Sequence, residues 1–165
     1  MKMRRNLPMN TIVIYFSRFG HTKLVAETIA ETMQANGSVR VIGADQLTNA
    51  DLEGAELVVM GTPTHKMNLP EAVRPVFDSL PKRILKDVPV AAFDTSYKMG
   101  WFLNKFTAAK KLNRKMRKMG GKPILPPETF LVVDREGPLY DGEIERAEIW
   151  AESILDGYNR FSEHR

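Results

Sequence analysis

The chain has 165 residues, a normal size for one domain with a single hydrophobic core. It contains no cysteine, which excludes disulfides, iron–sulfur clusters and thiol catalysis and is compatible with a reducing, cytoplasmic location. The net charge is +4, and no apolar run approaches the roughly 18–20 residues of a membrane span. We expect residues 1–9 to form a loosely ordered basic extension and residues 10–165 to form a single domain.

Strand and helix patterns alternate along the chain. Apolar runs predict strands near residues 11–16, 38–43, 56–61, 88–93 and 129–133. Apolar residues at spacings of three and four predict helices near residues 22–35, 70–79, 103–119 and 142–158, with a short helical turn near 48–53. Several strands are continuously apolar, which is typical of parallel strands covered by helices on both faces. The pattern predicts an α/β fold, a doubly wound three-layer sandwich on a five-stranded parallel sheet.

The loop between the first strand and the first helix is a candidate phosphate site. It consists of Ser17, Arg18, Phe19, Gly20, His21 and Thr22. Free backbone N–H groups and the positive end of the helix dipole converge on a loop in this position. The two hydroxyls add donors, and the glycine permits a positive φ or a close approach to a ligand. A single glycine excludes the nucleoside triphosphate and dinucleotide loops, which need more glycines. An ordinary capped turn is the structural alternative.

Two more polar loops follow the third and fourth strands, at the edge where this architecture binds ligands. The first contains Thr62, Pro63, Thr64 and His65. The second contains Asp94, Thr95, Ser96, Tyr97, Gly100 and Trp101. The three loops, in chain order, resemble the loops of the flavodoxin family, and the resemblance covers about residues 11–158. It implies a flavodoxin-like sheet and FMN as the cofactor.

The resemblance also implies a role for each loop. The first would hold the FMN phosphate, chiefly through backbone N–H groups, with Arg18 directed to solvent. The second and third would form the two walls around the flavin ring. We expect Tyr97 to stack on the ring, with Trp101 as its competitor. Asp94 is expected to fix its own loop through Asx-type hydrogen bonds, and His65 is either a wall of the pocket or a loop residue. We assign no catalytic residue and no metal ligand.

The positive charge is concentrated in one segment. Residues 95–127 contain nine Lys and Arg and no Asp or Glu. Apolar residues recur there at helical spacing, which predicts one buried stripe and a basic face; they are Phe102, Phe106, Ala109, Leu112, Met116 and Met119. The basic face is either simply solvated or a docking surface, within residues 98–122, for an acidic redox partner. We do not expect nucleic acid as a partner, because no recognised binding motif accompanies the charge.

The leading functional hypothesis is an FMN-binding protein that carries electrons between redox partners. In such a protein the cofactor supplies the chemistry and the chain tunes it. One alternative is an FMN-dependent NAD(P)H:quinone-type oxidoreductase of the same fold. A weaker alternative is a flavin-free interaction domain.

Overall fold

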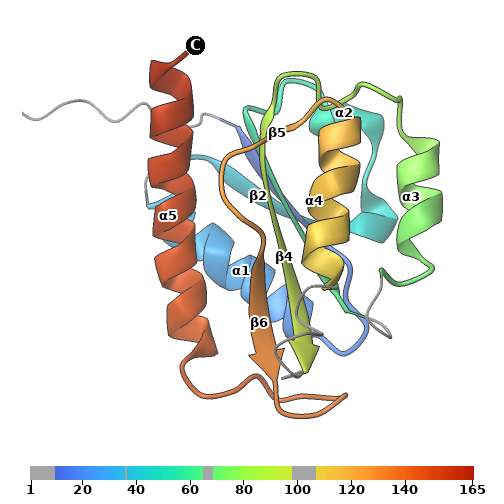
Figure 1. Ribbon diagram of the computed structural model, residues 1–165, viewed down its shortest axis with the longest axis vertical. Coiled ribbons are helices and arrows are strands. Elements are labelled where there is room, and N and C mark those ends of the chain that lie inside the picture. Colours follow the sequence, from blue (N-terminus) through green and yellow to red (C-terminus); the bar gives the residue numbers. More distant parts are fainter. Residues whose placement is uncertain (1–9, 36, 65–68, 98–106) are drawn as a thin grey trace, which may run out of the picture.

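The computed structural model describes residues 10–35, 37–64, 69–97 and 107–165, which form a parallel sheet between two layers of helices (Figure 1). The expected extension, residues 1–9, lies outside the described residues. The strands are β1 Thr11–Tyr15, β2 Val39–Gly43, β3 Leu57–Pro63, β4 Pro89–Tyr97, β5 Lys122–Pro123 and β6 Glu128–Val132. The helices are α1 His21–Gln34, α2 Asn49–Leu52, α3 Val73–Ser79, α4 Ala108–Lys118 and α5 Glu143–Glu163, with a 3₁₀ turn, η1, at Ala44–Gln46.

The sheet runs in the order β2-β1-β3-β4-β5, and β6 also pairs with β4. All of these pairings are parallel. The chain order reverses direction between β1 and β3, so the loops after these two strands flank the switch point. The predicted doubly wound α/β architecture is therefore confirmed.

The fifth position of the sheet is divided into two short strands. β5 pairs with the beginning of β4, where Pro89 faces Lys122, and β6 pairs with its end, where Asp94 faces Thr129. Pro126 and Pro127 lie between them, and a proline has no N–H to donate to a neighbouring strand. The sheet thus keeps the five positions that the sequence predicts, with the last one interrupted.

Strand alternation distributes the core over both faces of the sheet. Val13, Val59 and Phe93 pack on the side of α1 and α5. Ile14, Met60 and Ala92 pack on the opposite side, with Leu112 and Met116 of α4. Figure 1 shows α1 and α5 on one side of the strands and α3 and α4 on the other. Two-sided burial explains why these strands are continuously apolar.

Two strands are longer than predicted. β3 continues to Pro63 and β4 to Tyr97, so residues that we expected in loops belong to the ends of these strands. The expectation was wrong because polar residues usually mark the end of a buried strand. Here Asp94, Thr95 and Ser96 are buried, and pairing with β6 continues through them.

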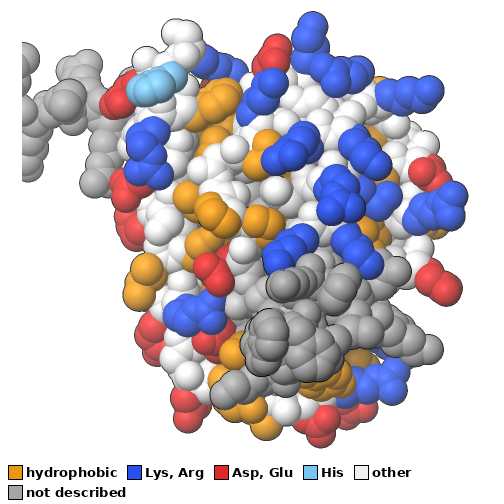
Figure 2. All heavy atoms as spheres, in the orientation of Figure 1, with side chains coloured by type: hydrophobic (Ala, Val, Ile, Leu, Met, Phe, Trp, Pro, Cys, Tyr) orange, Lys and Arg blue, Asp and Glu red, His pale blue; other side chains and the backbone are white. Residues whose placement is uncertain are grey.

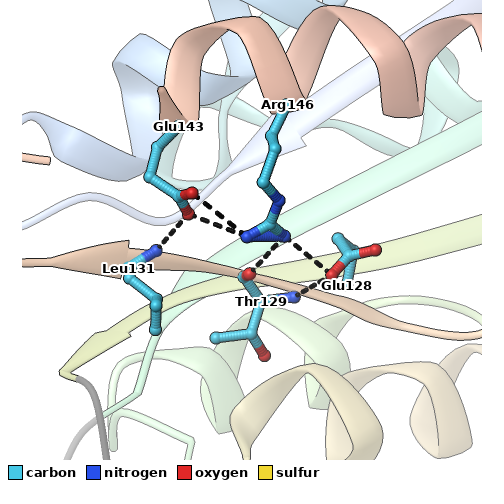
Figure 3. Close-up of polar contacts among 5 residues, drawn as sticks. All are labelled: Glu128, Thr129, Leu131, Glu143 and Arg146. Atoms are coloured by element: carbon cyan, nitrogen blue, oxygen red, sulfur yellow. Dashed lines mark hydrogen bonds and ion pairs between the residues drawn. The ribbon is translucent and has the colours of Figure 1, made fainter. Parts of the chain in front are cut away.

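A polar network attaches the start of α5 to the outer edge of β6 (Figure 3). Glu143 accepts a hydrogen bond from Leu131 N at 2.7 Å and two from Arg146 Nη1, at 3.1 and 3.0 Å. Arg146 Nη2 donates to Glu128 Oε1 and to the Thr129 carbonyl, each at 2.9 Å. These side chains therefore bind backbone groups of an edge strand that would otherwise be free to pair with another chain.

Candidate functional site

The turn from β1 into α1 leaves the helix N-terminus open. Gly20 is the N-cap residue with φ +88°, and no side chain caps the first turn among the described residues. That first turn also carries no acidic residue. The Ser17 hydroxyl accepts a hydrogen bond from Gly20 N at 3.0 Å and keeps its own hydrogen to donate. Uncapped N–H groups, the helix dipole and a free hydroxyl together suit an anion.

The first turn of α5 provides an internal contrast. It also begins after a glycine in the left-handed region, Gly142 with φ +90°. Its first turn, however, carries Glu143 and Glu145, whose carboxylates already complement the dipole. The two helices therefore differ: α1 begins without a carboxylate in its first turn, and α5 does not.

A buried hydrogen bond ties this loop to the end of β4. Thr22 is 2% exposed, and its Oγ1 lies 2.8 Å from Thr95 Oγ1. The Thr22 side chain therefore points at the neighbouring strand. Its N–H remains part of the first turn of α1. The turn from β1 into α1 and the fourth strand are thus held at a fixed separation.

His21 ties the same turn to the segment that precedes α5. Its Nε2 donates to the Glu136 carbonyl at 2.6 Å. Gly137 has φ +89°, and a Cβ there would lie 2.1 Å from the nearest atom of the His21 ring. The ring therefore occupies the space that a side chain at residue 137 would need. No sequence signal linked His21 to this segment, because His21 and Glu136 are 115 positions apart in the chain.

Asp94 does not form the expected local Asx turn. It lies within β4, is completely buried, and accepts from Thr64 Oγ1 at 2.5 Å and from Ala109 N at 3.1 Å. In an extended strand the carboxylate points away from its own following N–H groups, so its partners come from other elements. Burial raises the pKa of this carboxyl. The hydroxyls of Thr129 and Thr64, followed by the N–H groups of residues 109 and 108, oppose the rise.

The remaining predicted site residues that the structure describes lie around the same end of the sheet. Tyr97 is the last residue of β4 and is 41% exposed. Thr62 and Ser96 are buried and donate to the adjacent carbonyls of Pro63 and Tyr97. Arg18 and Phe19 are exposed, with the guanidinium carbon 5.3 Å from the ring centroid. His65, Gly100 and Trp101 lie outside the described residues.

A cleft of about 720 Å³ opens beside the turn from β1 into α1. The sequence analysis did not predict part of its lining, because these residues come from η1, from the start of α1 and from the segment before α3. Its walls comprise Tyr15, Phe16, Ser17, Arg18, Gly20, Lys23, Ala44, Asp45, Pro63, Pro70, Glu71 and Ala72. A cleft of this size accommodates a small organic cofactor or substrate.

The residues present fit FMN. The open start of α1 suits a phosphate, and the hydroxyl and aromatic residues at the ends of β3 and β4 suit a flat, partly polar ring. Within the described ranges no group of three His, Asp or Glu side chains could hold a metal ion. Within the same ranges no helix is both long and apolar enough to cross a membrane.

Comparisons with known proteins agree with this geometry. The model of the flavodoxin domain family matches residues 12–123, more than half of the chain. A flavodoxin of Clostridium saccharobutylicum is 26% identical over 155 residues, covering 90% of this chain and 96% of that protein. A solved flavodoxin from the domain Archaea superposes with a TM-score of 0.73 at 22% identity, covering 91% of this chain and 99% of that one. Flavodoxin 2 from Bacillus cereus gives a TM-score of 0.76 at 16% identity, covering 89% and 98%.

The family match extends through β1, α1, β3 and β4 and therefore includes all three loops at the carboxyl edge of the sheet. It confirms the resemblance that these loops carried in the sequence. The chain belongs to the flavodoxin domain family, whose cofactor is FMN and whose members carry electrons.

Proposed function

We propose that this chain binds FMN at the carboxyl edge of its sheet and carries electrons between redox partners. The observation that supports the proposal best is the open N-terminus of α1, which offers backbone N–H groups beside a free Ser17 hydroxyl. Bound FMN would supply the redox chemistry, accepting and releasing electrons at its ring. The chain then needs no general base and no nucleophile.

Each loop residue has a defined task in this proposal. The turn at residues 17–22 holds the phosphate, with Gly20 allowing the backbone to curve around it. Residues 62–65 and 95–101 enclose the ring. Tyr97, exposed at the end of β4, is the described residue placed to stack on it. The Thr22–Thr95 hydrogen bond keeps the phosphate turn and the ring wall at a fixed distance.

A comparison of FMN with riboflavin tests the phosphate site. The two ligands share the ring and differ in the phosphate, so wild type should bind FMN more tightly. Ser17→Ala should weaken FMN binding by about 1–3 kcal/mol, the cost of one lost charge-assisted hydrogen bond, and should affect riboflavin less. Titration of the apoprotein by flavin fluorescence measures both. Equal wild-type affinities for the two ligands would contradict the assignment.

The basic helix supports a more specific partner. Figure 2 shows Lys and Arg side chains gathered on the face that carries α4. Lys110, Arg114 and Lys118 are exposed at spacings of four residues, and none of the ion pairs among the described residues involves them. Ala109, Leu112 and Met116 form the buried stripe, as predicted; Phe102 and Phe106 lie outside the described residues. We infer an acidic redox partner that docks on this face.

The fold enlarges the basic face with residues from another part of the chain. The turn after α3 packs on the end of α4, where Leu85 N donates to Met119 O at 3.2 Å and Asp87 N to Gly120 O at 3.0 Å. This brings exposed Lys82 and Lys86 beside the helix. The sequence interpretation, confined to residues 98–122, did not include them.

Salt dependence tests the docking surface. Replacing Lys110, Arg114 and Lys118 with Glu should slow electron transfer to an acidic ferredoxin-type protein at low salt. The effect should shrink at physiological salt, where the screening length is about 8 Å. Arg160→Glu, on the helix layer across the sheet, is the matched control and should change the rate little. If both variants transfer electrons at the wild-type rate, the face is only solvated.

The alternatives gain no support from the topology, which electron carriers and reductases of this fold share. The curated relative is a flavodoxin, which favours the carrier. Slow NAD(P)H oxidation by the FMN-loaded protein in the presence of a quinone would agree with that choice, and rapid turnover would favour the reductase. A cytoplasmic location remains our prediction from the cysteine-free composition.

A further inference from the structure

A buried carboxylate joins three elements beside the proposed ring site. Asp94 in β4 accepts one hydrogen bond from the Thr64 hydroxyl, just past the end of β3, and another from Ala109 N in the first turn of α4. The same Thr64 oxygen accepts a hydrogen bond from Ala108 N at 3.1 Å. One carboxylate and one hydroxyl therefore connect the end of β3, the end of β4 and the start of α4.

These contacts lie at the ends of both segments proposed to enclose the ring. Thr64 belongs to the first of these segments, residues 62–65, and Thr95, next to Asp94, begins the second, residues 95–101. Thr64 N also donates to Thr95 O at 2.9 Å, which adds a backbone connection at the same place. The described parts of both segments thus adjoin a single buried cluster, which also contacts the start of α4.

The cluster is unusual for a sheet interior. Asp94 is completely buried, and among the described residues no Lys or Arg forms an ion pair with it. Its second oxygen, Oδ1, accepts no hydrogen bond of full geometry within the described part of the chain, although the nearby Thr129 hydroxyl favours the charged form. Burying a carboxylate without full compensation is unfavourable, and the dipole of α4 offsets only part of this cost. Strand pairing and packing alone do not require a carboxylate here.

We propose that Asp94 is a positioning residue of the flavin site: without touching the cofactor, it holds Thr64 at the end of β3 and the first turn of α4 against the end of β4, where the ring is proposed to bind. The inference rests on the proposed function. It assigns Asp94 to the ring side of the site, whereas Ser17 acts on the phosphate side. Loss of Asp94 should therefore weaken FMN and riboflavin by the same factor.

Three variants separate positioning from simple stability. Asp94→Asn keeps an oxygen that accepts from Thr64 and Ala109, so both flavins should bind within about twofold of wild type. Asp94→Ala removes the acceptor and should weaken both flavins by roughly five- to thirtyfold, the loss expected for one or two hydrogen bonds. Thr64→Val removes the hydroxyl, keeps the carboxylate and should act in the same direction, which covers the case in which Asp94→Ala does not fold.

Flavin fluorescence titration and urea unfolding of each apoprotein give the readouts. Parallel losses for FMN and riboflavin in Thr64→Val, with Asp94→Asn near wild type, would support the proposal. Reduced unfolding stability with unchanged flavin affinity would overturn it, because Asp94 would then be only structural. A loss confined to FMN would overturn it as well. Failure of wild type to bind either flavin would refute the proposed function itself, and this inference with it.

Discussion

Glu143 should contribute more to stability than any other carboxylate in the first turn of α5. Its side chain is 8% exposed and provides the acceptor for Leu131 N on the edge of β6 (Figure 3). Glu143→Ala leaves that N–H without its acceptor, at a cost of about 1–3 kcal/mol. It also removes the pairing with Arg146. Because that arginine is 41% exposed, we assign no more than about 1 kcal/mol to the pairing.

The expected total is about 2–3 kcal/mol, or roughly 5–10 °C in Tm for a domain of this size. Glu145→Ala is the matched control, because Glu145 shares the helix dipole but is exposed. It should cost only about 0.3–1 kcal/mol. Urea unfolding of the apoproteins, followed by far-ultraviolet circular dichroism, measures both, and an unchanged m value would show that the unfolded states are comparable.

Arg146→Ala completes a double-mutant cycle with Glu143→Ala. We expect a coupling energy near 1 kcal/mol, because the two side chains share hydrogen bonds. If Glu143→Ala costs no more than Glu145→Ala, the network does not hold α5 on β6 and the reasoning from its geometry is wrong.

The other predictions concern pH, packing and the histidine contact. Burial raises the pKa of Asp94 in the native state. Between the ordinary and the raised pKa, this carboxyl is therefore ionised in the unfolded chain and protonated in the native one. The free energy of unfolding should fall as pH rises through this window, and urea unfolding should show a smaller fall in Asp94→Asn. Gly61→Ala would place a Cβ 2.0 Å from the Phe93 ring and should lower the free energy of unfolding by about 1–3 kcal/mol. A loss below about 0.5 kcal/mol in thermal unfolding would mean that the ring moves aside freely. Gly137→Ala would place a Cβ against the His21 ring and would also strain the backbone, because residue 137 has a positive φ. If the contact with His21 fixes the position of residues 17–22, this variant should reduce the affinity for FMN more than for riboflavin. Equal reductions in a flavin titration would contradict that role.

Local patterns in the sequence were enough for the order and type of the main elements. Apolar runs and helical spacing depend on neighbouring residues, and the predicted strands and helices lie close to the observed ones. The turn from β1 into α1 was predictable for the same reason, because Gly20 and the start of α1 are contiguous. The resemblance to flavodoxins followed from short loops in chain order, which the family match confirms.

Tertiary structure decided what the polar residues do. The pairing of Thr22 with Thr95, the contact of His21 with Glu136 and the cluster around Asp94 join residues that are distant in the chain. A buried carboxylate looks like a loop residue in the sequence, since only its partners in other elements make burial tolerable. The interrupted fifth strand and the enlarged basic face have the same origin. Each depends on which segments pack side by side, and no local pattern carries that information.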